Sequence, residues 1–415
     1  MDLVTQVENY DHDGGELLRR VKCRDGTIVE SRVKCVRDGV DKAALPLHAQ
    51  YDGEWLSSVV SPARTQTRGT VSVIDVFAGC GGLTLGVAEA CRALGLAMEP
   101  ALAVDIDEKA LNVYERNFPE ATVEVGPVEA LVDPGRHGRA LKVERRLAEA
   151  YSGIDLLIGG PPCQGHSNLN NHTRWADPKN ELYMAMARFC ELLRPKHVII
   201  ENVPGVEKDY GQVAQRTWAR LKELGYEVNS GVLDSSVLGT AQVRRRSVTL
   251  ASRLVKPNVM NAQAEMAVTS PRSLLWAIGD LAVIDDSDPF DTPSTPNKLN
   301  QSRINYLFDS RLYNLPNSMR PDCHRLKVHS YTPMYGRLYP DRPAPTITTG
   351  FGSMGRGRFV HPTERRLLTP HEAARIQGFP DFFSFGNVAR GLLHKVIGNA
   401  VPPKLGYAAG MELLR

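Results

Sequence analysis

VSVIDVFAGCGGL, residues 71–83, is the stretch of this sequence that decides the fold. The apolar run from Val71 to Phe77 predicts a buried strand, and residues 83–94 predict a helix that follows directly. Glycines at such a turn let a ligand approach bare backbone amides. A glycine-rich turn after a parallel strand can also be purely structural, and this segment alone leaves both interpretations open.

The alternation of strand and helix continues along the chain. Further strands are predicted at residues 101–104, 154–158, 197–201 and 248–252, with helices at residues 107–118, 181–193 and 211–224. Strands that alternate with helices in this way build a doubly wound, mostly parallel sheet with helices on both faces. The sequence therefore predicts an α/β fold.

Both flanks of this region differ from it in composition. Residues 1–70 predict a small β-rich extension that ends in a linker, and its role as a structural cap or a binding module stays open. Residues 256–360 are rich in Pro, Asn, Asp and Ser and predict a smaller, irregular second domain. Between Arg303 and Arg366 stand eleven Arg or Lys, four acids and five interleaved tyrosines. That mixture suits contacts with phosphates and bases, while a solvated basic surface is the alternative.

The overall composition sets limits on function. With 42% apolar and 23% charged residues, the 415-residue chain is typical of soluble globular proteins. We expect no membrane span and no secretory signal, because no run approaches about 18 apolar residues, and thus a cytoplasmic protein. Seven scattered cysteines without a CxxC pair predict reduced thiols and no metal site. The net charge of +3 is too small to require a polyanionic partner.

Cys163 is the strongest candidate for a catalytic side chain. It lies in GGPPCQG, residues 159–165, directly after a predicted strand, at the sheet edge where open α/β folds bind ligands. A lone cysteine is usually an inert small apolar residue. In a rigid Pro-Pro loop flanked by glycines it is poorly placed for packing and well placed for attack, which favours a nucleophile.

Charged groups stand at the end of one predicted strand, on the same edge as Cys163, and immediately before another. Glu201, in ENVPG, could donate to a ring nitrogen when protonated, or it could be a structural or capping carboxylate. The segment QVRRR, residues 242–246, offers guanidinium groups suited to a pyrimidine oxygen and a phosphate. A solvated basic turn is the alternative for that segment.

Two further positions suit a nucleotide-like cofactor. Asp105 ends the second predicted strand, where an acid can bind a ribose, and Ile106 could cover an adenine face. Asp105 could equally be a helix N-cap, and Asn399, in IGNAVPP, could be the cap of the final helix.

In this order, these segments resemble the cytosine-C5 DNA methyltransferase family. The resemblance is carried by PPCQG, ENV, QxRxR, residues 366–380 (RLLTPHEAARIQGFP) and GNAVPP, and it covers residues 72–254 and about 342–415. It implies a Rossmann-like class I methyltransferase core over residues 71–255 and a target-recognition domain inserted at residues 256–360. Residues 361–415 would return to the core.

The resemblance also implies a reaction. S-adenosyl-L-methionine would donate a methyl group to C5 of a cytosine flipped out of duplex DNA, through a covalent bond between Cys163 and C6, leaving S-adenosyl-L-homocysteine. Glu201 would bind N3 and the exocyclic amine, Arg246 would bind O2, and Arg244 would support the loop. No metal is implied.

The remaining site residues are also implied by the resemblance. The predicted cofactor-binding residues are Phe77, Ala78, Gly79, Cys80, Gly81, Gly82, Leu83, Asp105, Ile106, Val128, Pro161, Leu182, Asn399, Ala400 and Val401. The predicted DNA-binding residues are Pro162, Gln164, Gly165, His166, Ser167, Asn202, Gln242, Thr348, Thr349 and Gly350.

Two positions depart from the family pattern. Pro127 precedes Val128 where the family often has an acid for the adenine amino group. His166 stands where Phe or Gln is more usual, and we expect it to tune the loop over the target base rather than bind metal.

Other functions stay open at this point. An RNA (tRNA) cytosine-C5 methyltransferase of the same fold is the nearest, although its Cys-Phe-Thr segment is absent here. A catalytically silent DNA-binding homologue is disfavoured by the complete set Cys163, Glu201 and Arg246. A dinucleotide oxidoreductase would leave the PPC, ENV and QxRxR segments unexplained. The expected partner is double-stranded DNA, with a cognate restriction endonuclease in a restriction-modification system as a further option, and the expected state is a monomer.

Overall fold

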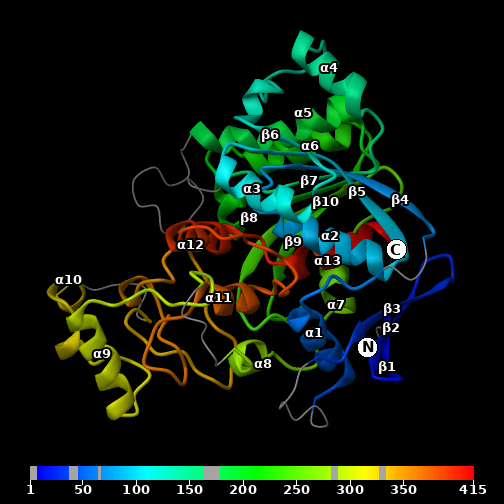
Figure 1. Cartoon of the computed structure of the whole chain (residues 1–415). Coiled ribbons are helices and arrows are strands. Elements are labelled where there is room, and N and C mark those ends of the chain that lie inside the picture. The colour runs from blue at the N-terminus through cyan, green and yellow to red at the C-terminus, as the bar shows by residue number, and fades with distance from the viewer. Residues whose placement is uncertain (1–6, 37–44, 64–66, 163–177, 282–287, 327–332) are drawn as a thin grey trace.

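A twisted seven-stranded sheet forms the centre of the molecule (Figure 1). The computed structural model describes residues 7–36, 45–63, 67–162, 178–281, 288–326 and 333–415. The strand order is β6-β5-β4-β7-β8-β10-β9, and every pairing is parallel except those of β10, which is antiparallel to β8 and to β9. The predicted doubly wound, mostly parallel sheet is confirmed. The strands are β4 (Gly69–Val76), β5 (Leu96–Asp105), β6 (Thr122–Val125), β7 (Leu156–Gly159), β8 (His197–Asn202), β9 (Glu227–Asp234) and β10 (Arg245–Ser252).

Helices cover both faces of this sheet (Figure 1). One face packs against α4 (Lys142–Tyr151), α5 (Tyr183–Leu193) and α6 (Val213–Glu223). The other packs against α2 (Gly82–Ala93), α3 (Glu108–Asn117) and α13 (Pro403–Leu414). The apolar side chains of each helix set close a separate core with the sheet, as a three-layer α/β domain requires.

The helices α2 and α13 approach each other at backbone distance. A Cβ atom added to Gly86 would lie 2.0 Å from the carbonyl oxygen of Pro403, and one added to Gly406 would lie 2.5 Å from that of Leu83. Only glycine fits such contacts, so the sequence of both helices fixes their close packing. The first turns of the two helices consequently lie side by side.

The N-terminal region forms a module beneath α2 and α13, which we define as residues 7–36 and 45–58 (Figure 1). It contains an antiparallel sheet of β1 (Glu8–Asp13), β2 (Glu16–Lys22) and β3 (Ile28–Lys34), which confirms the predicted β-rich character. The helix α1 (Leu47–Ser57) was not predicted. Its consecutive residues from Tyr51 to Leu56 are all buried, so the sequence lacks the apolar periodicity that identifies a helix.

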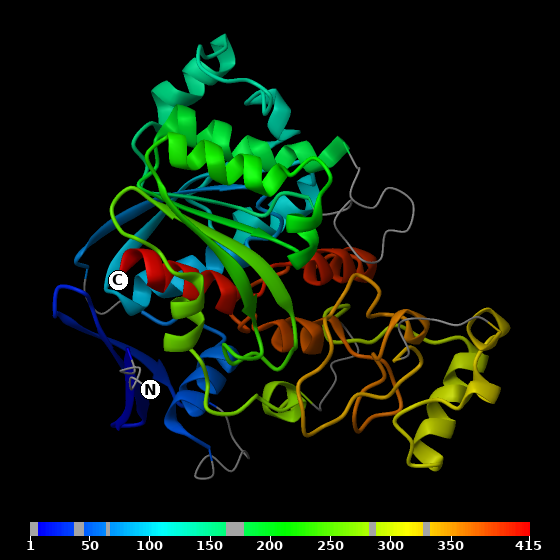
Figure 2. The same cartoon turned by 180° about the vertical axis from the view of Figure 1, so that it is seen from behind.

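The basic segment predicted for target recognition lies on the side away from the N-terminal module (Figures 1 and 2). Its described residues contain short helices but no strand longer than an isolated bridge: α9 (Lys298–Asp309), η5 (Asn317–Met319), α10 (Asp322–Arg325) and η6 (Met354–Arg356). They enclose a small core made of Ile304, Leu307, Leu315, Tyr335, Met354, Val360 and Leu367. The preceding helix α8 (Leu274–Ile278) lies against α1 instead. The helix α7 (Val259–Glu265) at the start of residues 256–360 packs instead against β9 and α13. The domain boundaries remain a prediction.

The C-terminal segment returns to the central sheet through α11 (Pro370–Gln377), α12 (Arg390–Asn399) and α13. Three further 3-10 turns connect core elements: η2 (Val128–Ala130), η3 (Pro178–Leu182) and η4 (Pro204–Lys208). Within the described ranges, no helix combines the length and apolar character needed to cross a membrane.

Candidate active site

The turn after β4 has a strained, glycine-dependent backbone. Phe77, Gly79 and Gly81 have φ angles of 62°, 55° and 89°, and a Cβ atom on Gly81 would lie 2.8 Å from the Phe118 ring. The Gly82 position is equally closed, since its Cβ would lie 2.3 Å from the carbonyl oxygen of Val401. This turn therefore opens α2 in direct contact with the segment that precedes α13.

Asp105 holds this turn against the end of β5. One carboxylate oxygen accepts a 2.8 Å hydrogen bond from the Gly79 amide, and the other accepts one of 2.8 Å from the Asp107 amide. The N-cap of α3 is Asp107, so the alternative that Asp105 caps this helix is wrong. Burial raises the pKa of Asp105 despite these bonds.

An apolar surface lies beside Asp105. Ile106 is 73% exposed, which is unusual for isoleucine in a folded protein. Val128, also predicted to bind cofactor, is buried under the neighbouring turn. An exposed apolar side chain next to an acid is suited to a ligand that combines a flat ring with hydroxyl groups.

The described part of the Pro-Pro loop passes over Glu201. The Asn202 side-chain amide donates a 3.1 Å hydrogen bond to the carbonyl oxygen of Pro161, and a Cβ atom on Gly160 would lie 3.2 Å from Glu201 Oε2. Pro162 is the last described residue before a gap. The predicted site residues Cys163, Gln164, Gly165, His166 and Ser167 lie outside the described residues.

Glu201 and Arg246 form an ion pair at this edge of the sheet. Arg246 Nε lies 2.8 Å from Glu201 Oε1, and their side chains are 15% and 10% exposed. The antiparallel pairing of β10 with β8 sets Val248 opposite Glu201 and so brings the two together. Burial raises the pKa of Glu201, with Arg246 and Arg244 opposing the rise, so Glu201 holds a proton more readily than an exposed glutamate.

Arg244 and Gln242 secure the loop of residues 346–350. The buried Arg244 guanidinium donates to the carbonyl oxygens of Ile347 at 2.7 Å and Ala400 at 3.0 Å. Gln242 accepts from the Ile347 amide at 2.6 Å, and a Cβ atom on Gly398 would lie 2.3 Å from the Thr349 nitrogen. The loop is therefore pressed against the C-terminal end of α12.

Two side chains predicted to bind DNA do not reach the surface. Gln242 is fully buried, with its amide bonded to Ile347 and Gln377, and Asn202 is 2% exposed. Asn202 uses its amide on Pro161 and accepts from the Val203 amide. In this structure both residues shape loops, because their polar atoms are already used inside the protein.

Other predicted cofactor residues lie around the glycine turn. Asn399 is exposed at the end of α12, and α13 begins only after Pro402, so the alternative that Asn399 caps the final helix is wrong. Leu182 is half-buried at the end of η3. Cys80 is buried and donates to the Val396 carbonyl, and burial raises the pKa of its thiol to about 12.

Sequence reasoning missed a buried carboxyl beneath the glycine turn. The Thr84 hydroxyl donates to Asp75 Oδ2 at 2.5 Å, and burial raises the pKa of Asp75 to about 8. A single acid inside the apolar run of residues 71–77 was the available signal. Among the described residues, no group of three His, Cys, Asp or Glu side chains is arranged to hold a metal ion.

A sheet with one antiparallel strand next to its edge, a glycine turn after β4 and an acid after β5 defines a Rossmann-like class I methyltransferase. The chain belongs to the C-5 cytosine-specific DNA methylase family, whose profile matches residues 71–415. It is a DNA (cytosine-5)-methyltransferase, as the resemblance implied.

Named relatives agree with this assignment. The chain is 46% identical to the Type II methyltransferase M1.BsuMI of Bacillus subtilis, over 99% of this chain and 95% of that protein. It is 28% identical to the Type II methyltransferase M.DdeI of Desulfomicrobium norvegicum, over 81% of this chain and 87% of the relative. Rice DNA (cytosine-5)-methyltransferase 1A is 28% identical over 85% of this chain but only 29% of its own length.

Solved structures share the fold. A putative DNA modification methyltransferase from an Escherichia coli prophage matches with a TM-score of 0.57 and 23% identity, covering 83% of this chain and 98% of that one. The S. pombe Dnmt2 methyltransferase matches with a TM-score of 0.58 and 17% identity, covering 83% of this chain and 98% of that one.

Proposed function

We propose that this enzyme methylates a cytosine flipped out of duplex DNA, with Cys163 as nucleophile and Glu201 and Arg246 as the groups that hold the ring. The observation that carries the proposal is the buried Glu201–Arg246 pair, 2.8 Å apart, beside the loop that leads into Cys163. A base inside a duplex cannot reach such an edge without leaving the stack.

The chemical step begins with the thiolate of Cys163. C5 of cytosine is a weak nucleophile, and addition of the thiolate to C6 moves the electron pair of the C5–C6 double bond to C5. C5 then takes the methyl group, for which S-adenosylhomocysteine would be the leaving group, and loss of the C5 proton to a base restores the double bond as the Cys163–C6 bond breaks. The thiolate is regenerated, so atoms and charge balance over the cycle.

Glu201 and Arg246 act on the ring during this addition. A protonated Glu201 donates to N3, where negative charge would otherwise accumulate, and burial favours this role because it raises the pKa of the carboxyl above its ordinary value. Arg246 binds O2 and orients Glu201 through their shared bond. Arg244 keeps the loop of residues 346–350 in place through Ile347.

The glycine turn fits S-adenosylmethionine. The Cβ position of Gly79 has no atom within 4 Å, which leaves room for a ligand against the main chain. Asp105 suits ribose hydroxyls, and the exposed Ile106 suits the adenine ring. When bound, this cofactor supplies an electrophilic methyl group on a sulfonium. Pro127 removes the acid that often binds the adenine amino group, so Ile106 carries a larger share of adenine recognition here.

DNA binding is assigned to the basic segment and the neighbouring loop. Residues 303–366 supply the excess of Arg and Lys for phosphate contacts. Thr348 to Gly350 belong to the loop that Arg244 binds through the Ile347 carbonyl. We further propose a monomer that acts in the cytoplasm, paired with a restriction endonuclease of the same target sequence. Genomic DNA from cells that express the enzyme should then resist that endonuclease.

The mechanism is tested with labelled S-adenosylmethionine and, separately, mixed-sequence duplex DNA and total RNA. Label should appear in 5-methyldeoxycytidine and vanish in Cys163→Ser, whereas the control Cys35→Ser, at an exposed thiol of the N-terminal module, should retain it. Duplex that contains 5-fluorocytosine should give a stable protein–DNA adduct, because fluorine cannot leave as a proton does. Label in RNA alone, or full activity in Cys163→Ser, would contradict the proposal.

A further inference from the structure

The helices α2 and α13 connect two distant parts of the molecule. At their first turns they carry the two segments assigned to cofactor, residues 77–83 and 399–401, which touch where Gly82 meets Val401. At their other ends both helices rest on the N-terminal module, through apolar contacts that include Val21, Val29 and Met411. A contact that holds α2 and α13 at a fixed position relative to each other therefore also fixes the distance between the two cofactor segments.

Arg19 on β2 binds both helices. Its guanidinium donates to Glu89 Oε1 of α2 at 2.8 Å and to the Tyr407 hydroxyl of α13 at 3.1 Å, while Nε donates to Ser31 at 3.0 Å. Arg19 is 2% exposed. Among the described residues of the module, only Arg19 has side-chain hydrogen bonds to both α2 and α13.

Neighbouring groups stiffen this contact. Arg92 of α2 forms two bonds to Glu89, at 2.8 and 2.7 Å, and one of 2.6 Å to the Tyr51 hydroxyl of α1. The Tyr407 hydroxyl in turn donates to Glu8 of β1. A guanidinium with a planar set of donors fixes direction as well as distance, so the arrangement defines the angle between module and helices.

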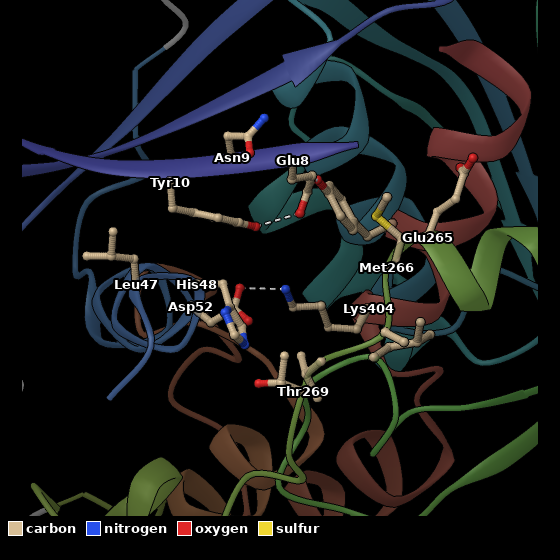
Figure 3. A pocket seen from close by; sticks show the side chains of 14 residues that line it. Glu8, Asn9, Tyr10, Leu47, His48, Asp52, Glu265, Met266, Thr269 and Lys404 are labelled. Atoms are coloured by element: carbon tan, nitrogen blue, oxygen red, sulfur yellow. Dashed lines mark hydrogen bonds and ion pairs between the residues drawn. The ribbon is translucent and has the colours of Figure 1, made fainter. Parts of the chain in front are cut away.

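A cavity of about 290 Å³ lies beside this contact, between the module and α13 (Figure 3). Glu8 and Tyr10 line it from β1, His48 and Asp52 from α1, and Lys404 from α13. Lys404 crosses to Asp52 at 2.6 Å. The cavity interrupts the packing there, so on this side the module meets α13 through a small number of polar bonds rather than a continuous apolar surface.

We propose that Arg19 is a positioning residue for the cofactor site: by joining Glu89 and Tyr407 it sets the packing of α2 on α13 and thereby the affinity for the cofactor. The module lies away from the basic segment assigned to DNA, so the effect falls on cofactor binding (Figures 1 and 2). This inference rests on the proposed cofactor assignment of residues 77–83 and 399–401. The N-terminal extension would thereby contribute to cofactor binding.

The test compares Arg19→Met with Arg20→Met in the full chain. Arg20 is the neighbour of Arg19 on β2 but pairs with Glu30 and Asp11 at the module's outer surface, with its side chain 40% exposed. The probe is S-adenosylhomocysteine, titrated calorimetrically without DNA. Arg19→Met should weaken its binding about tenfold, and Arg20→Met should change it less than twofold.

Two more measurements separate positioning from general damage. The KM for S-adenosylmethionine should rise in Arg19→Met, while the single-turnover rate at saturating cofactor stays within twofold of the wild type. Tyr407→Phe, which keeps the Arg19–Glu89 pair and removes the bonds of the Tyr407 hydroxyl to Arg19 and Glu8, should weaken S-adenosylhomocysteine binding about threefold. If Arg19→Met does not fold, Tyr407→Phe tests the positioning role of this contact by itself.

The outcomes are distinguishable. A wild-type chain that fails to bind S-adenosylhomocysteine would overturn the cofactor assignment and this inference together. A wild type that binds while folded Arg19→Met and Tyr407→Phe bind equally well would overturn this inference alone. A loss in single-turnover rate with unchanged binding would also overturn it.

Discussion

Two buried glutamates of this enzyme, each paired with arginine, have pKa values shifted in opposite directions. At the sheet edge, burial raises the pKa of Glu201, and Arg246 and Arg244 only oppose that rise. Beneath α2, burial also raises the pKa of Glu89, but Arg92 and Arg19 outweigh it and lower the pKa to about 2. The residue types and their burial are similar, whereas the protonation states that they favour are not.

The difference lies in the number and geometry of the donors. Glu89 accepts three guanidinium bonds of 2.7 to 2.8 Å from two arginines, whereas Glu201 has one such contact with Arg246. Each charged bond favours the ionised carboxylate, and burial disfavours it. The three bonds to Glu89 thus favour its carboxylate form, whereas Glu201, with a single charged donor, holds a proton more readily than an exposed glutamate.

Glu201→Gln should give the largest effect on the reaction. Because the amide cannot supply a proton to N3, the single-turnover rate should fall about 100- to 1000-fold, within the range of general acid catalysis. Binding of S-adenosylhomocysteine should change less than twofold. A rate within tenfold of the wild type would mean that Glu201 is a structural anion like Glu89.

Glu89→Gln should mainly affect stability. The change leaves Arg19 and Arg92 buried without a carboxylate, which costs on the order of 3 kcal/mol in free energy of unfolding. Urea unfolding followed by tryptophan fluorescence measures the loss. The exposed Glu99→Gln is the control and should stay within about 0.5 kcal/mol. Equal stability of Glu89→Gln and the control would refute the assignment of Glu89 as an anion that the fold needs.

The pH dependence of unfolding should have opposite slopes at the two sites. The pKa of Glu89 lies below its ordinary value of 4.5, so its stabilising contribution is complete above pH 4.5 and is lost as the pH falls toward 2. The pKa of Glu201 lies above 4.5, so wild type should lose stability relative to Glu201→Gln as the pH rises beyond that value. Unfolding free energies of wild type and both variants from pH 3 to pH 7 test this, and slopes of the same sign would contradict the comparison.

Asp75→Asn should give the smallest loss of stability. Asp75 accepts a hydrogen bond from Thr84, whose hydroxyl also lies 3.3 Å from that of Tyr114, and no arginine pairs with Asp75 in the part of the chain that the structure describes. Burial raises the pKa of Asp75 to about 8. Below pH 3.8 the carboxyl is neutral in both the folded and the unfolded chain, so the amide should change the free energy of unfolding by less than about 1 kcal/mol there. Between pH 3.8 and about 8 only the unfolded chain gives up this proton, so the wild type should lose stability relative to Asp75→Asn across that range, with no further loss above it. A loss of several kcal/mol at pH 6.5 would show that Asp75 is ionised in the fold.

Much of the sheet was predictable because its strands are apolar and end at glycine or acidic residues. Residues 71–77 and 197–201 were both assigned from such runs, and β4 and β8 confirm them. The strands β6 and β9 were missed since β6 is four residues long and largely exposed, and β9 contains Asn229, Ser230 and Gly231. Edge strands of this kind carry little apolar signal.

The site was predictable to the extent that strand ends converge on one edge. That logic brought Glu201 and Arg246 together, and the structure has them in contact. It could not reveal that Gln242 is buried or that Arg19 binds α2 and α13, since these depend on contacts between segments far apart in the sequence. Local patterns specify elements, whereas the packing of glycines and buried charges between them specifies the details.

The packing of α13 on α2 also has a consequence for how the enzyme is made. The ribosome synthesises α13 about 320 residues after α2. Until then Gly86 has no partner and Gly82 has no Val401 to rest on, although the strands between the two helices can already pair. Contacts so distant in sequence form slowly and late. A nascent chain halted before residue 399 would hold every strand of the central sheet but neither Val401 nor α13 to support the glycine turn, so we expect methylation competence only once the final helix is made.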